Sequence, residues 1–344
     1  MKNFFIKVIV LIVAGMMFFP VGITSAADQK EKKYKFRLQC AYHESAFVGQ
    51  TSKFFVQRVK ELTNGNVDIK IFWPDQLVKT NETFEAVRKG MLDFYIGSIL
   101  YFSGYVPEVN CEWIPFGWTD PKEPLELFRD HGWLDLMREA LDKHNVRYVA
   151  PLAVASMGLI TKFPVHNVSD LKGRSIRAVG MEGKIIDVLG GSPVSLTGAE
   201  QYMALHRGTV DGTDFPFYTI GSYRFYEVCN YIIRPALHAP GLIEILTSRR
   251  AYEKLPEKYQ AAIDQAGWET FERSVQLNPS WDEEAYAMCD EKGVEIIDLT
   301  PEALNEFRKA TIPLWNELAE KSDVSRKLVE SLKAYLSNKG IEVE

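Results

Sequence analysis

The 344-residue sequence has few cysteines and histidines, and neither set is spaced as a metal site requires. The six histidines form no HExxH pattern, which excludes the commonest zinc protease motif. The cysteines are far apart and lie in apolar segments, which fits no zinc site. In an oxidising compartment they could pair, but the connectivity cannot be read from sequence. We expect mostly buried free thiols, no metal and no cofactor; the cysteines are Cys40, Cys111, Cys229 and Cys289.

The common catalytic motifs are also missing. Neither GxSxG nor GxGxxG occurs between a predicted strand and a predicted helix. The stretch Gly180–Lys184 (GMEGK) lacks the spacing and the hydroxyl residue of a phosphate-binding loop. His43 and Glu44 are the one neighbouring pair that could mimic an acid/base site, but adjacent residues at a strand end usually point apart. We therefore expect no enzyme, and a secreted hydrolase or lyase that uses this pair is the alternative.

Long apolar runs are absent after the first residues of the chain. Met1–Lys7 carries two lysines and no acid, and it precedes the apolar run Val8–Phe19. This run is shorter than the roughly 20 residues that a transmembrane helix needs. Small residues follow at Thr24–Ala27, as at a cleavage site. We expect residues 1–26 to be a secretory signal peptide, so that the mature protein is periplasmic and has no membrane span.

The chain has more acidic than basic residues. Removing residues 1–26 takes away two lysines, which changes the formal net charge from −6 to −8. An acidic exported protein is a poor candidate for binding nucleic acid or an anionic membrane. The remaining 318 residues exceed a typical single core, so two lobes are expected.

Strand-like and helical patterns alternate along most of the mature chain, which favours parallel sheets with helices on both faces. The first block predicts strands at 34–41, 67–73, 92–97 and 146–150, with helices at 47–63, 81–90 and 125–144. The later pattern predicts strands at 242–247 and 294–298, and helices at 256–289, 301–318 and 324–339. Pro279 should kink or split the long helix.

These segments predict an α/β fold with two lobes. A second βα block runs from Leu152 to about Pro240, and the strand at 242–247 is expected to return to the first lobe. We expect lobe I to comprise residues 34–150 plus about 242–280. Lobe II then comprises residues 151–241 plus about 281–344. No low-complexity linker separates them, so several crossings should join the lobes.

One stretch, Val168–Pro216, reads as an α/β unit with an arginine at its ligand-facing edge. Arg177 lies in a predicted strand at 174–179, which a helix at 182–189 and a second strand at 194–196 follow. Ligands of open α/β sheets bind beyond the carboxyl ends of strands. A guanidinium there offers a fork of donors suited to a carboxylate. A surface ion pair is the alternative interpretation.

Several segments resemble, in order, the extracytoplasmic solute-binding subunits of tripartite ATP-independent periplasmic (TRAP) transporters, the DctP-like family. They cover nearly the whole mature sequence: LTNGNVDIKIF, PDQL, FEAVRKGMLDF, WIPF, DLKGRSIRAVG, GAEQYMALHRGTVDGTDFP and FYEVCNYI. The resemblance implies a periplasmic binding protein fold with a ligand cleft between two lobes. Hinge strands and a long helix would connect these lobes. It also implies capture of a small organic acid for delivery to membrane permease subunits. A sensor that reports the ligand to a membrane receptor is the alternative.

The resemblance also assigns residues of the second lobe. Arg177 stands where the family binds the substrate carboxylate. Asp214 and Phe215 stand where relatives have an acid followed by asparagine or tryptophan, and in the tryptophan branch the acid can help hold a metal ion. Here the shorter acid and the phenylalanine imply an aromatic wall, and we expect no metal. Met157 lies where many relatives carry a second arginine or glutamine, which suggests a monocarboxylate with an aromatic or branched body.

On the first lobe, residues that follow predicted strands should face the cleft. Tyr42 and His43 follow the first strand, and Ser98 and Tyr101 follow the strand at 92–97. The tyrosines could supply a hydroxyl or a ring face. Asn81 opens a helix whose N–H groups could meet an anion, and Tyr218 on the second lobe is a further candidate. For each, the alternative is a residue that only caps or packs.

Overall fold

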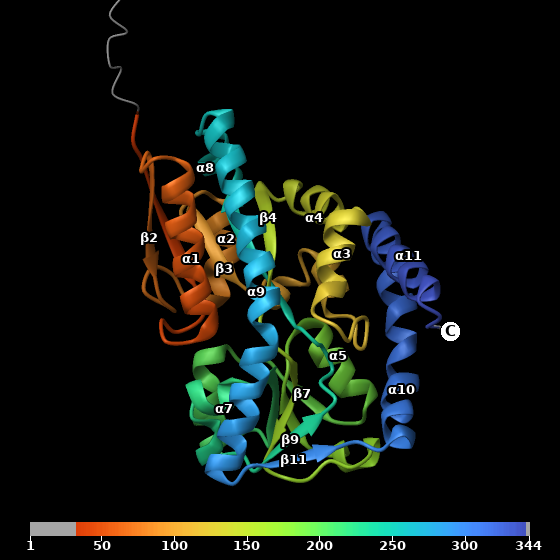
Figure 1. Cartoon of the computed structure of the whole chain (residues 1–344). Helices are drawn as coiled ribbons and strands as arrows, with labels where there is room; N and C mark the ends of the chain where they lie inside the picture. The colour runs from red at the N-terminus through yellow and green to blue at the C-terminus, as the bar shows by residue number, and fades with distance from the viewer. Residues whose placement is uncertain (1–31, 342–344) are drawn as a thin grey trace, which may run out of the picture. The chain divides into compact units, whose positions relative to one another are not determined.

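The computed structural model describes residues 32–341, so the predicted signal peptide lies outside the described residues. A compact unit starts at Lys33 and contains two β-sheets flanked by helices (Figure 1). This confirms the predicted α/β class. Within residues 32–341, no helix is both long enough and apolar enough to cross a membrane.

The first sheet has five strands in the order β2-β1-β3-β10-β4. Its strands are β1 (Tyr34–Cys40), β2 (Val67–Phe72), β3 (Phe94–Gly97), β4 (Val146–Ala153) and β10 (Leu242–Ser248). β1 pairs in parallel with β2 and β3, whereas β10 runs antiparallel to β3 and β4. Every residue of β3 and β10 is buried, as expected for strands covered on both faces.

Helices of the first block are α1 (Phe47–Leu62), α2 (Thr83–Arg88), α3 (Lys122–Asp130), α4 (Trp133–Asp142) and α8 (Arg249–Glu253). The prediction of one helix over 125–144 was wrong. The chain breaks at His131 and Gly132, and Gly132 has a φ of 76°, in the left-handed region that glycine adopts without a steric penalty. Two shorter helices result, and each buries its own apolar face.

The second sheet has six strands in the order β11-β9-β5-β8-β6-β7. They are β5 (Met157–Thr161), β6 (Ser175–Arg177), β7 (Ser192–Val194), β8 (Gly212–Pro216), β9 (Tyr231–Arg234) and β11 (Glu295–Asp298). β6 pairs in parallel with β7 and β8, but β5 runs antiparallel to β8 and β9. Both sheets are therefore mixed, which corrects the expectation of parallel sheets. The chain crosses between the sheets before β5 and before β10, and both strands run antiparallel to their neighbours. It returns to the second sheet at β11, which pairs in parallel with β9.

The second block carries α5 (Gly180–Val188), α6 (Gln201–Arg207) and α7 (Thr219–Ser222). The last two helices, α10 (Pro301–Ala319) and α11 (Asp323–Asn338), pack against each other. Six short 3₁₀ segments complete the elements: η1 (Thr80–Glu82), η2 (Leu100–Phe102), η3 (Pro107–Trp113), η4 (Val168–Leu171), η5 (Gly198–Glu200) and η6 (Phe225–Glu227).

The long helix α9 (Glu257–Lys292) runs past both sheets (Figure 1). It contacts α1 and β4 at one end and α7 and β11 at the other. Pro279 lies within it without ending it, so the predicted split is wrong. Trp281 is buried beside Pro279 and stacks on Phe47 of α1, with ring centroids 5.0 Å apart. This packing stabilises the helix across a position where the backbone N–H is missing.

All four cysteines are buried and free, as predicted. The strand β10 joins the first sheet, so β5 to β9 of the second sheet lie between β4 and β10 in sequence, and β11 follows after α9. The residue boundaries of the two lobes remain the prediction made above.

Candidate functional site

Arg177 is the last residue of β6, between β7 and β8 in the second sheet. Only 1% of its surface is exposed, so it is one of the largest fully buried side chains. Burial of a guanidinium without partners is very unfavourable, and its donors must therefore be satisfied locally. The exposed ion pair considered as the alternative is thus wrong for this arginine.

The guanidinium nitrogens of Arg177 donate hydrogen bonds to four different residues. Its Nε donates to the carbonyl oxygen of Leu196 at 3.0 Å. Its Nη1 donates to the carbonyl oxygen of Asp214 at 2.9 Å and to Oε2 of Glu182 at 3.1 Å. Its Nη2 donates to the hydroxyl of Tyr101 at 2.7 Å. The terminal nitrogens therefore already hold one carboxylate and one phenol oxygen, both of which a bound carboxylate could replace.

An aromatic ring lies over the same guanidinium. The guanidinium carbon of Arg177 is 5.0 Å from the ring centroid of Phe215, which is close enough for a cation–π interaction. Phe215 in turn stacks on Tyr42 of the first block, with ring centroids 6.3 Å apart. It also meets the ring of Tyr223 edge-on at 5.7 Å. The arginine and its aromatic wall are thus packed into one cluster.

Two further contacts beside Arg177 join the first block of the chain to the second. Tyr101 is the middle residue of η2 in the first block, and its hydroxyl accepts the hydrogen bond from Arg177 in the second. The ring of His43 lies 5.3 Å from that of Tyr223. Together with the stack of Tyr42 on Phe215, these contacts hold the blocks against each other around the arginine.

The cluster contains two buried carboxyl groups. Both side-chain oxygens of Asp214 lack a hydrogen-bond partner, and the residue is fully buried. Burial raises the pKa of Asp214 to about 7, although the nearby charge of Arg177 opposes the shift. Burial likewise raises the pKa of Glu182 to about 8, with Arg177 opposing the shift and Asp214 adding to it. At neutral pH the cluster can therefore exchange protons.

The DctP family model, described as bacterial extracellular solute-binding protein, family 7, matches residues 41–322. The chain belongs to this family. It is 24% identical over 324 residues to the monocarboxylate 2-oxoacid-binding periplasmic protein of Nostoc sp., covering 91% of this chain and 86% of that protein.

Solved structures confirm the two-lobed TRAP solute-binding fold of this family 7 protein. A TRAP protein of Desulfovibrio salexigens with bound orotic acid has a TM-score of 0.82 at 24% identity, over 89% of this chain and 99% of that one. DctP7 of Bordetella pertussis, a receptor binding pyroglutamic acid, has a TM-score of 0.80 at 19% identity, over 87% and 99%. The predicted family is thus confirmed, and so is the predicted function of a solute-binding protein. The family and the relatives named above are solute-binding proteins and not enzymes.

Within this family 7 protein, five of the predicted residues come together: Arg177, Asp214, Phe215, Tyr42 and Tyr101. Ser98 lies at the edge of the cluster, where its hydroxyl accepts the N–H of Leu100 and so shapes the turn that presents Tyr101. Tyr218 is buried with an unpartnered hydroxyl, and its ring packs on Phe47.

Asn81 and Met157 lie elsewhere, whereas His43 contacts the cluster through Tyr223. Asn81 is exposed on η1. Met157 pairs its backbone with His238 and lies against Gly241 at the crossing between the blocks. Glu44 forms an ion pair with Lys53 at 2.7 Å, whereas the His43 ring lies on Tyr223. The acid and the base of the alternative enzyme site therefore face different partners.

Sequence reasoning missed Glu182 and Tyr223. Glu182 occupies the third position of α5, where its Oε2 accepts the N–H of Val179 at 3.1 Å, a typical helix-capping role. A glutamate at that helix position, five residues after a buried arginine, was a usable signal. Tyr223 carried none, because its position depends on the fold of the chain after β8. Within residues 32–341 there is no group of three or more potential metal ligands.

Proposed function

We propose that this protein captures a monocarboxylate in the periplasm and delivers it to membrane permease subunits, without chemical conversion. Arg177 binds the carboxylate, and Phe215 and Tyr42 form the aromatic wall beside it. Tyr101, on the first lobe, contacts the arginine when the two lobes are closed. The observation that carries the proposal is the buried, fully coordinated Arg177 at the contact between the two lobes.

The chemistry of this cluster supports an anion with one charged end. A carboxylate can replace the Glu182 carboxylate and the Tyr101 hydroxyl on the two terminal nitrogens of Arg177. The rings around the guanidinium favour a flat or apolar body. The ligands named for the related proteins, a 2-oxoacid, orotic acid and pyroglutamic acid, each combine one carboxylate with a compact body.

Binding would be coupled to closure of the lobes. Tyr101 and Arg177 belong to different lobes, so their contact exists only when the lobes are together. A ligand that bridges the same residues would favour the closed form by adding contacts that the open form lacks. The permease would then recognise the closed form. Catalysis is not part of the proposal, because His43 and Glu44 do not act as a pair.

The experiment is a thermal-shift screen of monocarboxylates, with 2-oxoacids, pyroglutamate and orotate included, followed by titration calorimetry on the best ligand. The test variant is the double substitution Arg177→Gln with Glu182→Gln. It removes the guanidinium together with the buried carboxyl group that faces it, so that neither is left without its partner. Loss of two charge-assisted hydrogen bonds, at about 1.5–3 kcal/mol each, should weaken binding by roughly 100-fold or more.

The control is Arg174→Gln, which removes an exposed arginine just before the same strand. It should bind the ligand as the unmodified protein does. If the double variant keeps its folded melting transition and binds the acid within a few-fold of the unmodified protein, Arg177 does not hold the carboxylate. Conversion of the acid during the titration would show an enzyme instead.

A further inference from the structure

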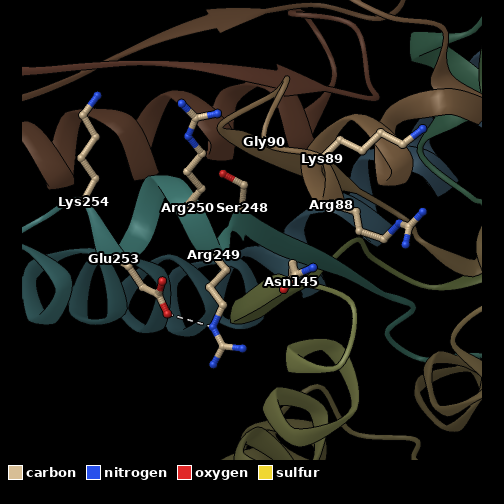
Figure 2. A pocket seen from close by; sticks show the side chains of 9 residues that line it. All are labelled: Arg88, Lys89, Gly90, Asn145, Ser248, Arg249, Arg250, Glu253 and Lys254. Carbon is tan, nitrogen blue, oxygen red and sulfur yellow. Dashed lines mark hydrogen bonds and ion pairs between the residues drawn. The ribbon is translucent and has the colours of Figure 1, made fainter.

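A second polar pocket lies at the far end of the first sheet from Arg177. It has a volume of about 450 Å³ and is lined by α8 and the residue after it, the end of α2 and the two residues after it, the residue before β4 and the last residue of β10 (Figure 2). Ser248, at this end of β10, pairs with Val146, whereas Glu244 pairs with Gly97 near the Tyr101 turn. At about 3.3 Å per residue, the length of β10 separates the pocket from that turn by more than roughly 10 Å.

The pocket is strongly basic on a protein with a formal net charge of −6. Five cationic side chains and one carboxylate line it: Arg88, Lys89, Arg249, Arg250, Lys254 and Glu253. A concave surface with one sign of charge concentrates ions of the opposite sign. The local charge therefore contrasts with that of the whole chain.

Some of these cations are already neutralised by neighbours. Arg88 and Lys89 share Glu85, at 2.8 Å and 3.4 Å. Arg249 pairs with Glu253 at 2.9 Å and turns away from Arg250 (Figure 2). These three side chains contribute little free charge.

Arg250 and Lys254 are different. Both are exposed, and neither has an ion-pair partner among residues 32–341. Their side chains extend from the same side of α8, with Ser248 beside Arg250 (Figure 2). Another pocket adjoins this one and shares Arg250 and Lys254 with it. The carboxylate that lines it is that of Asp93, whose Oδ2 accepts the backbone N–H of Arg37 and lies 3.8 Å from its Nε.

Two local features set the position of these groups. The aliphatic part of the Arg250 side chain lies over Gly90, where an added Cβ would be 3.2 Å from Cδ of the arginine. The Ser248 oxygen accepts the N–H of Ala251 at 3.1 Å and caps α8, which leaves the hydroxyl proton free to donate. An arginine, a lysine and a hydroxyl donor are a donor set that suits a phosphate group.

We propose that this pocket is a second binding site, for a phosphate-bearing anion. The phosphate would contact Arg250, Lys254 and the Ser248 hydroxyl. The same donor set would hold a soluble phosphate compound or the phosphate of an anionic phospholipid headgroup. This site does not depend on the organic-acid site at Arg177.

The test measures binding of pyrophosphate to the full mature protein by titration calorimetry at low salt. The double variant Arg250→Gln with Lys254→Gln should weaken this binding at least about tenfold, because two charge-assisted contacts are lost. The matched control, Lys172→Gln with Arg174→Gln, removes two exposed cations from the second lobe and should bind as the unmodified protein does. Affinity should fall as salt is raised.

A parallel arm separates the two sources of phosphate. Sedimentation with vesicles that contain phosphatidylglycerol, compared with pure phosphatidylcholine vesicles, tests the lipid headgroup. Binding of either probe that only the Arg250 and Lys254 variant loses supports the site and identifies its source. If the unmodified protein binds neither probe, or if both double variants weaken binding equally, the proposal is wrong.

Discussion

Replacement of Glu182 by glutamine should change how carboxylate binding depends on pH. In the structure the Glu182 carboxylate occupies Nη1 of Arg177, one of the two nitrogens that a ligand needs. Burial raises the pKa of this group to about 8. Below pH 8 the folded protein therefore carries a proton on Glu182, and the neutral acid competes weakly for the guanidinium. Above pH 8 the proton is lost, and the Glu182 carboxylate then competes with the ligand for the guanidinium of Arg177.

The size of the effect follows from this pKa. If only the protonated form admits the ligand, affinity falls tenfold for each pH unit above the pKa. Between pH 7 and pH 9 the unmodified protein should lose about tenfold in affinity, which corresponds to roughly 1.4 kcal/mol. A simple monocarboxylate and the arginine keep their charges over this range, so neither produces the change. The Glu182→Gln variant should lack it.

The assay is titration calorimetry with the best ligand of the screen, from pH 6 to pH 9, in buffers of different ionisation enthalpy. The unmodified protein should take up a proton on binding near pH 8.5, and Glu182→Gln should not. Asp214→Asn removes a group that adds to the raised pKa of Glu182, so in this variant the fall in affinity should begin at a lower pH. An affinity of the unmodified protein that stays constant from pH 7 to 9, or an equal fall in Glu182→Gln, would refute the reasoning.

Two further predictions concern closure and stability. Tyr101→Phe removes the hydroxyl that accepts the Nη2 hydrogen bond of Arg177 from the other lobe, so the ligand-free protein should open. Its radius of gyration, measured by X-ray scattering, should then increase, and an unchanged radius would contradict this role of Tyr101. Burial raises the pKa of Glu112, which accepts a hydrogen bond from Tyr148, to about 7, so the folded state holds a proton that the unfolded state has lost. Stability should therefore fall as pH rises from about 4.5 to 7, and Glu112→Gln should flatten this part of the melting-temperature profile, whereas an equally steep profile would exclude Glu112 as its source.

Much of the fold could be predicted from local patterns. The helix predicted over 47–63 is found at Phe47–Leu62, because its apolar spacing and the Asn64-Gly65 stop agree. The break at Gly132 was missed, since the apolar spacing continues through it and only the local backbone conformation reveals it. Pro279 does not split the long helix as its local preference predicted, because tertiary packing overrides that preference, and the predicted kink stays a prediction.

The site was predictable only in part. Arg177 could be placed because its strand and the following helix are local features of the sequence. Its contact with Tyr101 joins residues 76 positions apart, and no local pattern shows which tyrosine reaches it. The pairing of Arg177 with Glu182 was also missed. The burial that brings the two groups together and raises the pKa of Glu182 is a property of the packed structure and not of a local pattern.

The proline in α9 has a mechanical consequence. Pro279 has no N–H, so the carbonyl of Val275 loses its helical donor at the level where α9 passes between the lobes. A helix resists bending through its hydrogen-bond ladder, and the rung at this point is absent. We therefore expect the helix to bend most easily at Pro279, so that a substitution at this position should change how readily the two lobes open without altering any residue of the Arg177 cluster.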